Sequence, residues 1–286
     1  MPNIVLAEYD EMLDKVATKK PGQRRAKAHL RSAFIALVLV FLFLPIIVLV
    51  AFSFNTSKMN IIFTGFTFEW YGKLFENRDL LEAFRNTLII ASLSTVISTI
   101  IGTISAVGLK KYNFFGEKFI GNLIYIPIVI PELVLGIALL SVFTLFKLEL
   151  GFWTVLLAHI SFSIPFVITS VRSTLYSFSP SIEEAAEDLG ASRFETFWYV
   201  TLPMIKPGII AGATLAFTLS MDDVVVSYFT AGPGTNTLPL YIYANIKTGI
   251  TPDVNALTTI MLLVTMLLLI IIAKVESRKR LMRSRE

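Results

Sequence analysis

Six long apolar runs constrain this chain more than any other feature of its sequence. They cover approximately residues 32–54, 87–109, 119–146, 152–171, 208–231 and 254–273. A helix needs roughly 20 apolar residues to cross the hydrocarbon core of a bilayer, and each run provides them. Only 16% of the 286 residues are charged, whereas a soluble chain carries about a quarter. The sequence therefore predicts an all-α membrane protein with six transmembrane helices.

Lys and Arg are distributed unevenly among the segments that join these runs. Most of the 25 Lys and Arg residues lie before the first run, after the second, after the fourth or after the sixth. Because positively charged segments stay in the cytoplasm, both termini and residues 179–207 are predicted to be cytoplasmic. This asymmetry explains the net charge of +4, which therefore does not indicate a nucleic-acid partner.

The same boundaries divide the chain into three parts. Residues 1–31 form a cytoplasmic N-terminal extension, residues 32–275 the transmembrane domain and residues 276–286 a basic cytoplasmic tail. Residues 5–16 carry apolar side chains at helical spacing. An amphipathic helix on a membrane or partner and a disordered tail are both compatible with this extension.

The loop at residues 179–207 lies between two apolar runs but is too polar to cross a membrane. Its first half has acidic side chains on one helical face and four apolar residues at the i, i+3, i+4, i+7 spacing on the other. The apolar residues are Ile182, Ala185, Ala186 and Leu189. We expect an amphipathic helix that Gly190 ends, because glycine readily adopts the left-handed conformation of a helix C-cap.

Serines mark the expected helix starts in this loop. The first helix begins either with Ser181, which has a glutamate three residues later as in a capping box, or with Ser179, which would place a proline at the first helical position. Ser192 repeats the capping-box spacing for a second helix. We expect Pro203 to end that helix, because proline lacks a backbone N–H.

A short sequence pattern follows from these positions. It consists of Glu184-Ala185-Ala186, Gly190 and Val200-Thr201-Leu202-Pro203. The pattern resembles the EAA loop of the permease subunits of ABC importers, with Val200 where that family has isoleucine. The resemblance implies the fold of a type I importer permease and a loop that couples to a cytoplasmic ATPase. The implied coupling residues are Glu184, Ala185, Ala186, Gly190, Leu202 and Pro203.

Three acidic side chains lie inside the predicted spans, where charges are costly and usually functional. Glu132 follows Pro131, and prolines are tolerated there where a helix lines a cavity; a hydrogen-bonded glutamate that joins two helices is the structural alternative. Asp222 and Asp223 are adjacent, so they would point about 100° apart on a helix. We expect Asp223 near a stripe of small residues, at a packed interface or on the pathway. The stripe consists of Gly208, Gly212 and Ala216.

These acids have no Lys or Arg inside any run to neutralise them, so a pathway that they line favours a cationic substrate. Aromatic side chains near the outer mouth would add cation–π contacts. Trp and Tyr are also enriched at membrane interfaces in proteins of any function. A location at the interface, without contact to the substrate, is therefore the alternative for these aromatic residues. The predicted pathway residues are Glu132, Asp222, Asp223, Trp70, Tyr228 and Tyr243.

Other chemistry is not expected of this chain. His159 has no acid within its own run, which favours a hydrogen-bonded structural histidine. With no cysteine and only two histidines far apart, no metal site is expected. The sequence contains no G-x-x-x-x-G-K-[ST] phosphate loop. We therefore expect no cofactor on this chain, and ATP and Mg on a separate ATPase.

A second set of residues surrounds the two aspartates. Its members are residues 218–227, 232–233, 238–240, 242–243 and 252–257. They resemble the permeases of bacterial spermidine/putrescine importers of the PotC type, a likeness that extends over residues 32–275. The resemblance implies an inner-membrane complex with a second related permease, two copies of a cytoplasmic ATPase and an external polyamine-binding protein, all surrounded by membrane lipid.

We therefore expect a transport subunit rather than an enzyme, which forms half of a polyamine pathway that works by alternating access. An importer of another small cation, such as ferric iron or thiamine, is the nearest alternative. An intramembrane enzyme that uses the acids is not favoured, because no Asp-x-x-Asp or His-Glu-x-x-His spacing supports it. A channel or scaffold without a motor is the third alternative.

Overall fold

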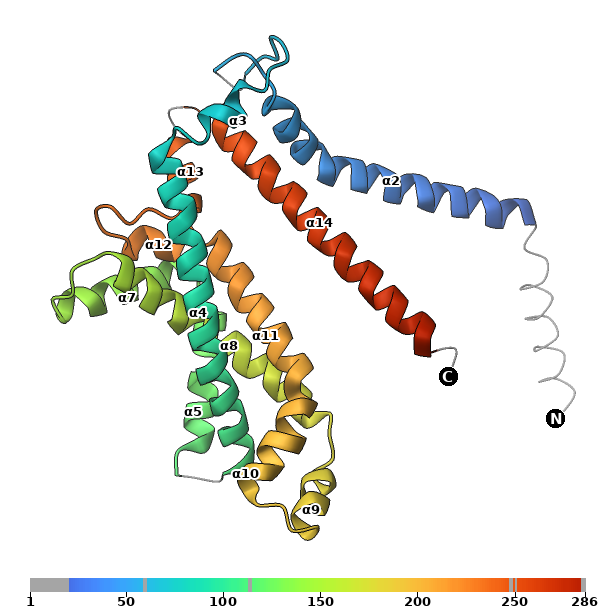
Figure 1. Cartoon of the computed structure of the whole chain (residues 1–286), viewed down its shortest axis with the longest axis vertical. Helices are drawn as coiled ribbons and strands as arrows, with labels where there is room; N and C mark the ends of the chain where they lie inside the picture. Colours follow the sequence, from blue (N-terminus) through green and yellow to red (C-terminus); the bar gives the residue numbers. More distant parts are fainter. Residues whose placement is uncertain (1–20, 59–60, 113–114, 247–248, 250, 284–286) are drawn as a thin grey trace, which may run out of the picture. The chain divides into compact units, whose positions relative to one another are not determined.

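The computed structural model describes residues 21–58, 61–112, 115–246, 249 and 251–283. The segment at residues 5–16, for which an amphipathic helix was considered, lies outside these ranges. The described residues form helices and connecting loops, with one isolated bridge between Asn55 and Phe66 and no strand (Figure 1). The prediction of an all-α protein is confirmed.

The chain divides into two compact units, Met1–Tyr71 with Thr251–Glu286, and Gly72–Ile250. The first unit contains helices α2 (Pro21–Phe52) and α14 (Pro252–Arg283), which contact each other. α2 begins well before the first apolar run, so the helix extends into the part of the chain expected as an extension. Helix α3 (Glu69–Lys73) follows a loop in which aromatic rings pack together.

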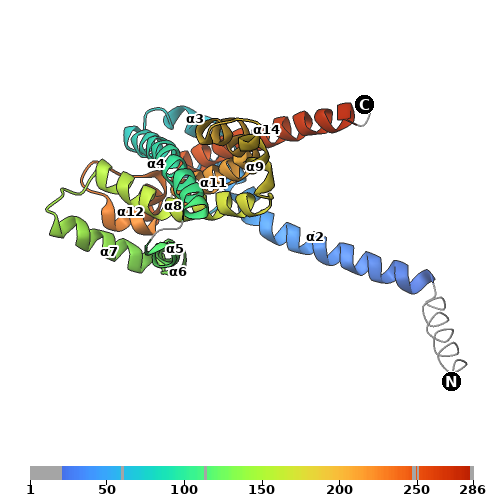
Figure 2. The same ribbon diagram turned by 90° about the horizontal axis from the view of Figure 1, so that it is seen from below.

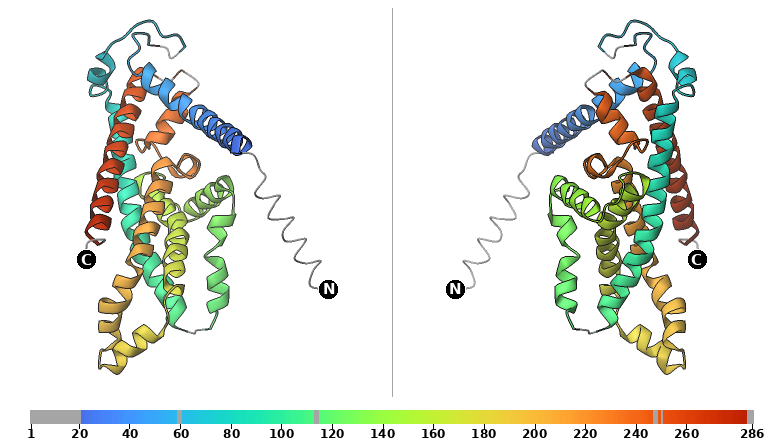
Figure 3. Two further views of the ribbon diagram at one scale, coloured as in Figure 1. Left: turned by 90° about the vertical axis from the view of Figure 1, so that its right-hand side faces the viewer. Right: turned by 90° about the vertical axis from the view of Figure 1, so that its left-hand side faces the viewer.

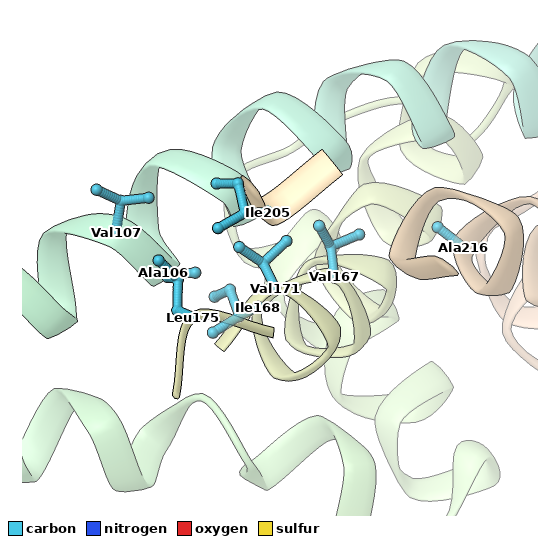
Figure 4. Packing of buried hydrophobic residues seen from close by; sticks show 8 residues of the cluster. All are labelled: Ala106, Val107, Val167, Ile168, Val171, Leu175, Ile205 and Ala216. Atoms are coloured by element: carbon cyan, nitrogen blue, oxygen red, sulfur yellow. The ribbon is translucent and has the colours of Figure 1, made fainter. Parts of the chain in front are cut away.

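Three helices form the bundle of the second unit. They are α4 (Arg78–Lys111), α8 (Phe152–Tyr176) and α11 (Leu202–Asp222). Figure 4 shows the apolar core that they share: Ala106, Val107, Val167, Ile168, Val171, Leu175, Ile205 and Ala216. Gly208 allows the closest approach, because a Cβ built on it would lie 2.3 Å from the Thr174 hydroxyl of α8. The small-residue stripe is thus a buried packing face of α11, as expected.

The remaining elements of this unit lie beside the bundle or toward its ends. Helices α5 (Glu117–Leu123) and α6 (Ile126–Val129) follow one another alongside it and overlap when viewed end-on in Figure 2, while α7 (Glu132–Leu145) packs against α12 (Val225–Thr230). Helices α9 (Ser181–Asp188) and α10 (Arg193–Thr196) form a hairpin at one end. α7, α12 and α13 (Leu238–Asn245) lie toward the other end (Figure 3).

The described residues include four helices that are long and apolar enough to cross a membrane: Arg31–Phe52, Arg78–Lys111, Phe152–Tyr176 and Arg193–Asp222. The third expected span is a broken one, Glu117–Val129 and Glu132–Leu145, bent by 113°. In α14 the apolar segment with described side chains is Pro252–Leu267, and the rest of the expected sixth span lies largely outside the described side chains. Six continuous spans are therefore not confirmed, although the positions of the helices follow the apolar runs.

The fifth span differs from its prediction at both ends. Residues 208–231 were expected as one helix, but a continuous helix begins at Arg193 and ends at Asp222. Pro203 does not end a helix, so that expectation is wrong. A π turn (Phe197–Thr201) precedes α11, and its wider i→i+5 bonding is compatible with a proline that has no N–H to donate. The far end stops because the side chain of Asp223 caps the next helix.

The hairpin confirms two of its expected caps. Gly190 has φ +95°, and the N–H groups of Gly190 and Ala191 donate to the carbonyls of Glu187 and Ala186, as in a Schellman motif. Ser192 forms a capping box with the glutamate three residues later. The start of α9 differs from both expectations, because Pro180 is the N-cap and its carbonyl accepts the first helical N–H bonds.

Candidate functional site

The break in the third span positions Glu132. Ile130 and Pro131 have extended ψ angles, so that α7 starts afresh with Glu132 as its first residue. The side chain is exposed, and its carboxylate makes no hydrogen bond or ion pair within the described part of the chain. Pro131 lies at this break as the N-cap of α7, where its missing N–H costs no helical hydrogen bond. A glutamate that joins two helices by hydrogen bonds finds no support in this geometry.

The two aspartates occupy different environments at the end of α11. Asp222 is the last helical residue and is exposed, whereas Asp223 is 8% exposed and lies in extended backbone. The Asp223 carboxylate accepts the N–H groups of Val226 (3.1 Å) and Ser227 (2.7 Å), which are otherwise unbonded at the start of α12. The two aspartates thus differ in exposure and in bonding. The expectation that they point about 100° apart on one helix is wrong, because the helix ends between them.

A cavity of about 320 Å³ lies between the two breaks. Its lining includes all three acids, and the remaining lining side chains are apolar. The lining residues are Pro127, Ile128, Ile130, Glu132, Leu135, Phe162, Phe166, Leu219, Asp222, Asp223, Val224, Val225 and Val226. Carboxylates in an apolar wall produce a negative potential that water screens only in part. The cavity therefore suits a cation.

An aromatic cavity of about 270 Å³ adjoins the acidic one, and the two share Val224 and Val225. Its lining residues are Leu133, Val224, Val225, Tyr228, Phe229 and Tyr243. The rings of Tyr228 and Tyr243 stand nearly perpendicular, with centroids 6.4 Å apart. Two breaks in the helices thus bring together five of the six predicted pathway residues, although the sequence separates them by more than a hundred positions.

Trp70 is the sixth predicted pathway residue, and its surroundings belong to the first unit. Its side chain is buried, and its indole N–H donates to the carbonyl of Asn55 at 2.6 Å. Next to Trp70 in α3, the ring of Tyr71 packs against that of Phe54 in the preceding loop. A packing role between α3 and this loop accounts for these contacts.

His159 was expected to be a hydrogen-bonded structural histidine, and it is fully buried in α8. Its Nδ1 lies 2.7 Å from the hydroxyl of Ser220, and its Nε2 lies 3.0 Å from that of Ser227 and 3.4 Å from the Asp223 carboxylate. Sequence reasoning missed this acid because it searched only the histidine's own span. The two serines, which flank Asp223 at helical spacing, were the available signal.

The hairpin at the opposite end of the unit also contains two adjacent acids in different environments. Glu183 pairs with Lys111 of α4 at 3.0 Å and accepts a hydrogen bond from the Thr201 hydroxyl. Burial raises the pKa of Glu183, but the bonds from Thr201 and Lys111 outweigh it, so that its pKa lies below the ordinary value. Glu184 is exposed. Glu183 therefore anchors α9 to the bundle.

The apolar face of the hairpin is uncovered among the described residues. Leu189 is 91% exposed, and Phe194 and Trp198 stack in parallel on the surface. Of the predicted coupling residues, Glu184, Ala185, Gly190 and Pro203 are exposed, whereas Ala186 and Leu202 are half-buried. Such an exposed apolar surface is typical of a protein interaction site.

The helical bundle, the broken spans and the exposed hairpin define a transport permease, and the sequence agrees. Residues 98–280 match the family of binding-protein-dependent transport system inner membrane components, and the chain belongs to this family. It is therefore an integral inner-membrane transport component of an ABC importer rather than an enzyme.

Within this family the chain is similar to polyamine permeases. It is 43% identical to the spermidine/putrescine transport system permease protein PotC of Escherichia coli K12, over 84% of this chain and 91% of the relative. It is 38% identical to the putrescine transport system permease protein PotI of the same strain, over 81% and 85%.

The fold is also that of a solved importer. A bacterial ABC transporter involved in the import of alginate contains a chain that superposes with a TM-score of 0.68 at 17% identity, over 88% of this chain and 97% of that one. The low identity makes this a likeness of fold alone. The type I importer fold expected from the sequence is confirmed.

Proposed function

We propose that this chain is a permease subunit of an ATP-driven polyamine importer and forms half of its translocation pathway. The acidic cavity beside the aromatic one carries the proposal, because a polyamine combines ammonium groups with apolar methylene segments. Glu132 and Asp222 would contact the ammonium groups. Tyr228 and Tyr243 would contact the chain through cation–π and apolar interactions worth roughly 0.5–2 kcal/mol each. The names of the similar permeases support the same substrate class.

The hairpin receives the energy for transport in this proposal. An ATPase on the cytoplasmic side would bind ATP and Mg, and the apolar side chains of the hairpin would seat in a groove on its surface. The complex would contain a second related permease, two ATPase copies and an external polyamine-binding protein. The distribution of Lys and Arg supports a cytoplasmic location for both chain termini.

Uptake of labelled spermidine and putrescine by the complex reconstituted in vesicles tests the substrate class. We expect Glu132→Gln to raise the KM for spermidine about tenfold, since one charge contact of about 1.4 kcal/mol is lost, while assembly with the ATPase is unchanged. Glu149→Gln is the matched control, because Glu149 is an exposed acid that lines neither cavity. Stimulation of the ATPase by a binding protein loaded with ferric iron or thiamine, and not by one loaded with a polyamine, would overturn the proposal.

A further inference from the structure

A buried polar network connects four helices beside the acidic cavity. Ser94 of α4 donates to the hydroxyl of Ser220 on α11, which lies 2.7 Å from His159 Nδ1 on α8. On the other side of the ring, His159 Nε2 faces Ser227 of α12 and the carboxylate of Asp223. Each of these five side chains is at most 8% exposed. The network ends at the residue where the fifth span breaks.

The Asp223 carboxylate assigns the donor role to one ring nitrogen, Nε2, because an ionised carboxylate only accepts hydrogen bonds. Nε2–H is therefore the donor toward Asp223 and Ser227. On the other side of the ring, Ser220 lies against Nδ1 and also contacts the Ser94 hydroxyl, which is within 3.2 Å of the Ala91 carbonyl as well. Asp223 completes the arrangement by accepting two backbone N–H groups of α12. Both ring nitrogens thus have polar partners, which a buried network requires.

This network binds one of the two adjacent aspartates and leaves the other exposed. The Asp223 carboxylate uses both oxygens within the protein, and they hold α12 at a fixed angle after α11. Within the part of the chain that the structure describes, no hydrogen bond or ion pair joins Asp222 to the histidine, and Asp222 is exposed at the cavity wall. Its position depends on the direction in which the chain leaves α11, which the histidine determines through Asp223 and Ser220.

We propose that His159 is a positioning residue for transport: it holds the break between α11 and α12 through Ser220, Ser227 and Asp223, so that Asp222 rather than Asp223 is presented to the cationic substrate. This assignment rests on the proposed function for its substrate. The geometry of the break does not depend on which substrate is carried, and it can be tested separately.

Cysteine labelling tests the geometry, because the chain has no cysteine of its own. Val226→Cys replaces a residue that is 1% exposed and follows the break directly. We expect a small cationic thiol reagent to label it slowly in the complex, and about tenfold faster when His159→Leu is added, since losing about 1.4 kcal/mol of the buried contacts opens the first turn of α12. Glu149→Cys is the exposed control and should label at one rate in both backgrounds. An unchanged Val226→Cys rate would overturn the proposal.

Two polar replacements of similar size test the role in transport. His159→Gln reaches the position of Nε2 and keeps the contact with Asp223, whereas His159→Asn reaches only the side of Ser220. We expect His159→Gln to keep the parental KM within about threefold and His159→Asn to raise it about tenfold, with a smaller change in maximal rate at matched protein levels. If His159 acted by packing alone, His159→Leu and His159→Gln would have similar KM values. That result would contradict a positioning role.

The two sets of measurements distinguish failure of this inference from failure of the proposed function. If labelling accelerates but no polyamine is carried by the parent complex, the substrate assignment fails and the positioning role stands. If polyamines are carried and His159→Asn behaves like His159→Gln, the positioning role fails alone. If His159→Leu does not accumulate in the membrane, the geometry is tested instead by the labelling rates of Val226→Cys in the His159→Asn and His159→Gln backgrounds.

Discussion

The cavity end and the hairpin end of the bundle each contain a pair of adjacent acids, and the pairs are used in parallel ways. At the cavity, Asp223 is bound within the protein and Asp222 is exposed. At the hairpin, Glu183 is bound to Lys111 and Thr201, and Glu184 is exposed. Each pair therefore combines one acid that holds a segment in place with one that is free to meet a partner.

The two ends differ in how deeply the anchoring acid is buried. Asp223 is almost fully buried and accepts two backbone N–H groups that have no helical partner at the start of α12. Glu183 is half-buried, and water competes with its ion pair. The break at the cavity should therefore be rigid, whereas the hairpin should yield more readily to a partner.

The largest effect should come from the anchor at the cavity. Asp223→Ala leaves two buried N–H groups without an acceptor, at a cost of roughly 1–3 kcal/mol each. We expect a clear loss of thermal stability of the solubilised protein. Asp222→Ala is the matched control, and it should leave stability almost unchanged while weakening substrate binding. Equal losses of stability from both substitutions would remove the distinction between anchoring and exposed acid.

An intermediate effect is expected where the hairpin depends on backbone conformation. Gly190 has φ +95°, and a Cβ there would meet no atom within 4 Å, so a substitution costs backbone strain of about 1–2 kcal/mol and no clash. We expect Gly190→Val to remain in the membrane and to lower ATP-driven uptake. Gly190→Asn, which tolerates positive φ, should retain more uptake. Normal uptake by Gly190→Val in vesicles with matched protein levels would show that the turn plays no part in coupling.

The smallest effect should come from the anchor at the hairpin. Glu183→Gln removes an ion pair that is partly exposed, worth about 0.2–1 kcal/mol. The pKa of Glu183 is lowered in the folded protein, so its stabilising contribution is present at neutral pH and is lost as pH falls through that lowered pKa. The protection of the α9 amides, which is their exchange rate relative to the intrinsic rate at the same pH, should therefore fall in acid in the parent and depend less on pH in Glu183→Gln. Glu187→Gln, an exposed acid on the same helix, is the control.

Local sequence signals predicted much of the fold. The apolar runs located the helices, Gly190 and Ser192 marked real caps, and Pro131 marked the break beside Glu132. The prediction that Pro203 ends a helix was wrong, because the π turn that directly precedes α11 accommodates this proline within a continuous helix. The prediction of one helix over residues 208–231 was wrong as well, since apolar composition does not reveal that Asp223 caps a new helix.

The sequence by itself determined which segments become helices, where glycine permits a left-handed turn and which acids lie within apolar surroundings, because these depend on neighbours within a few residues. Only the tertiary structure decided which acid of each pair is exposed. His159 in α8 and Asp223 at the break after α11 are distant in the sequence, as are Lys111 in α4 and Glu183 in α9. Such pairs form only when packing of the bundle brings distant residues together, and the packing thereby leaves Asp222 and Glu184 free to act.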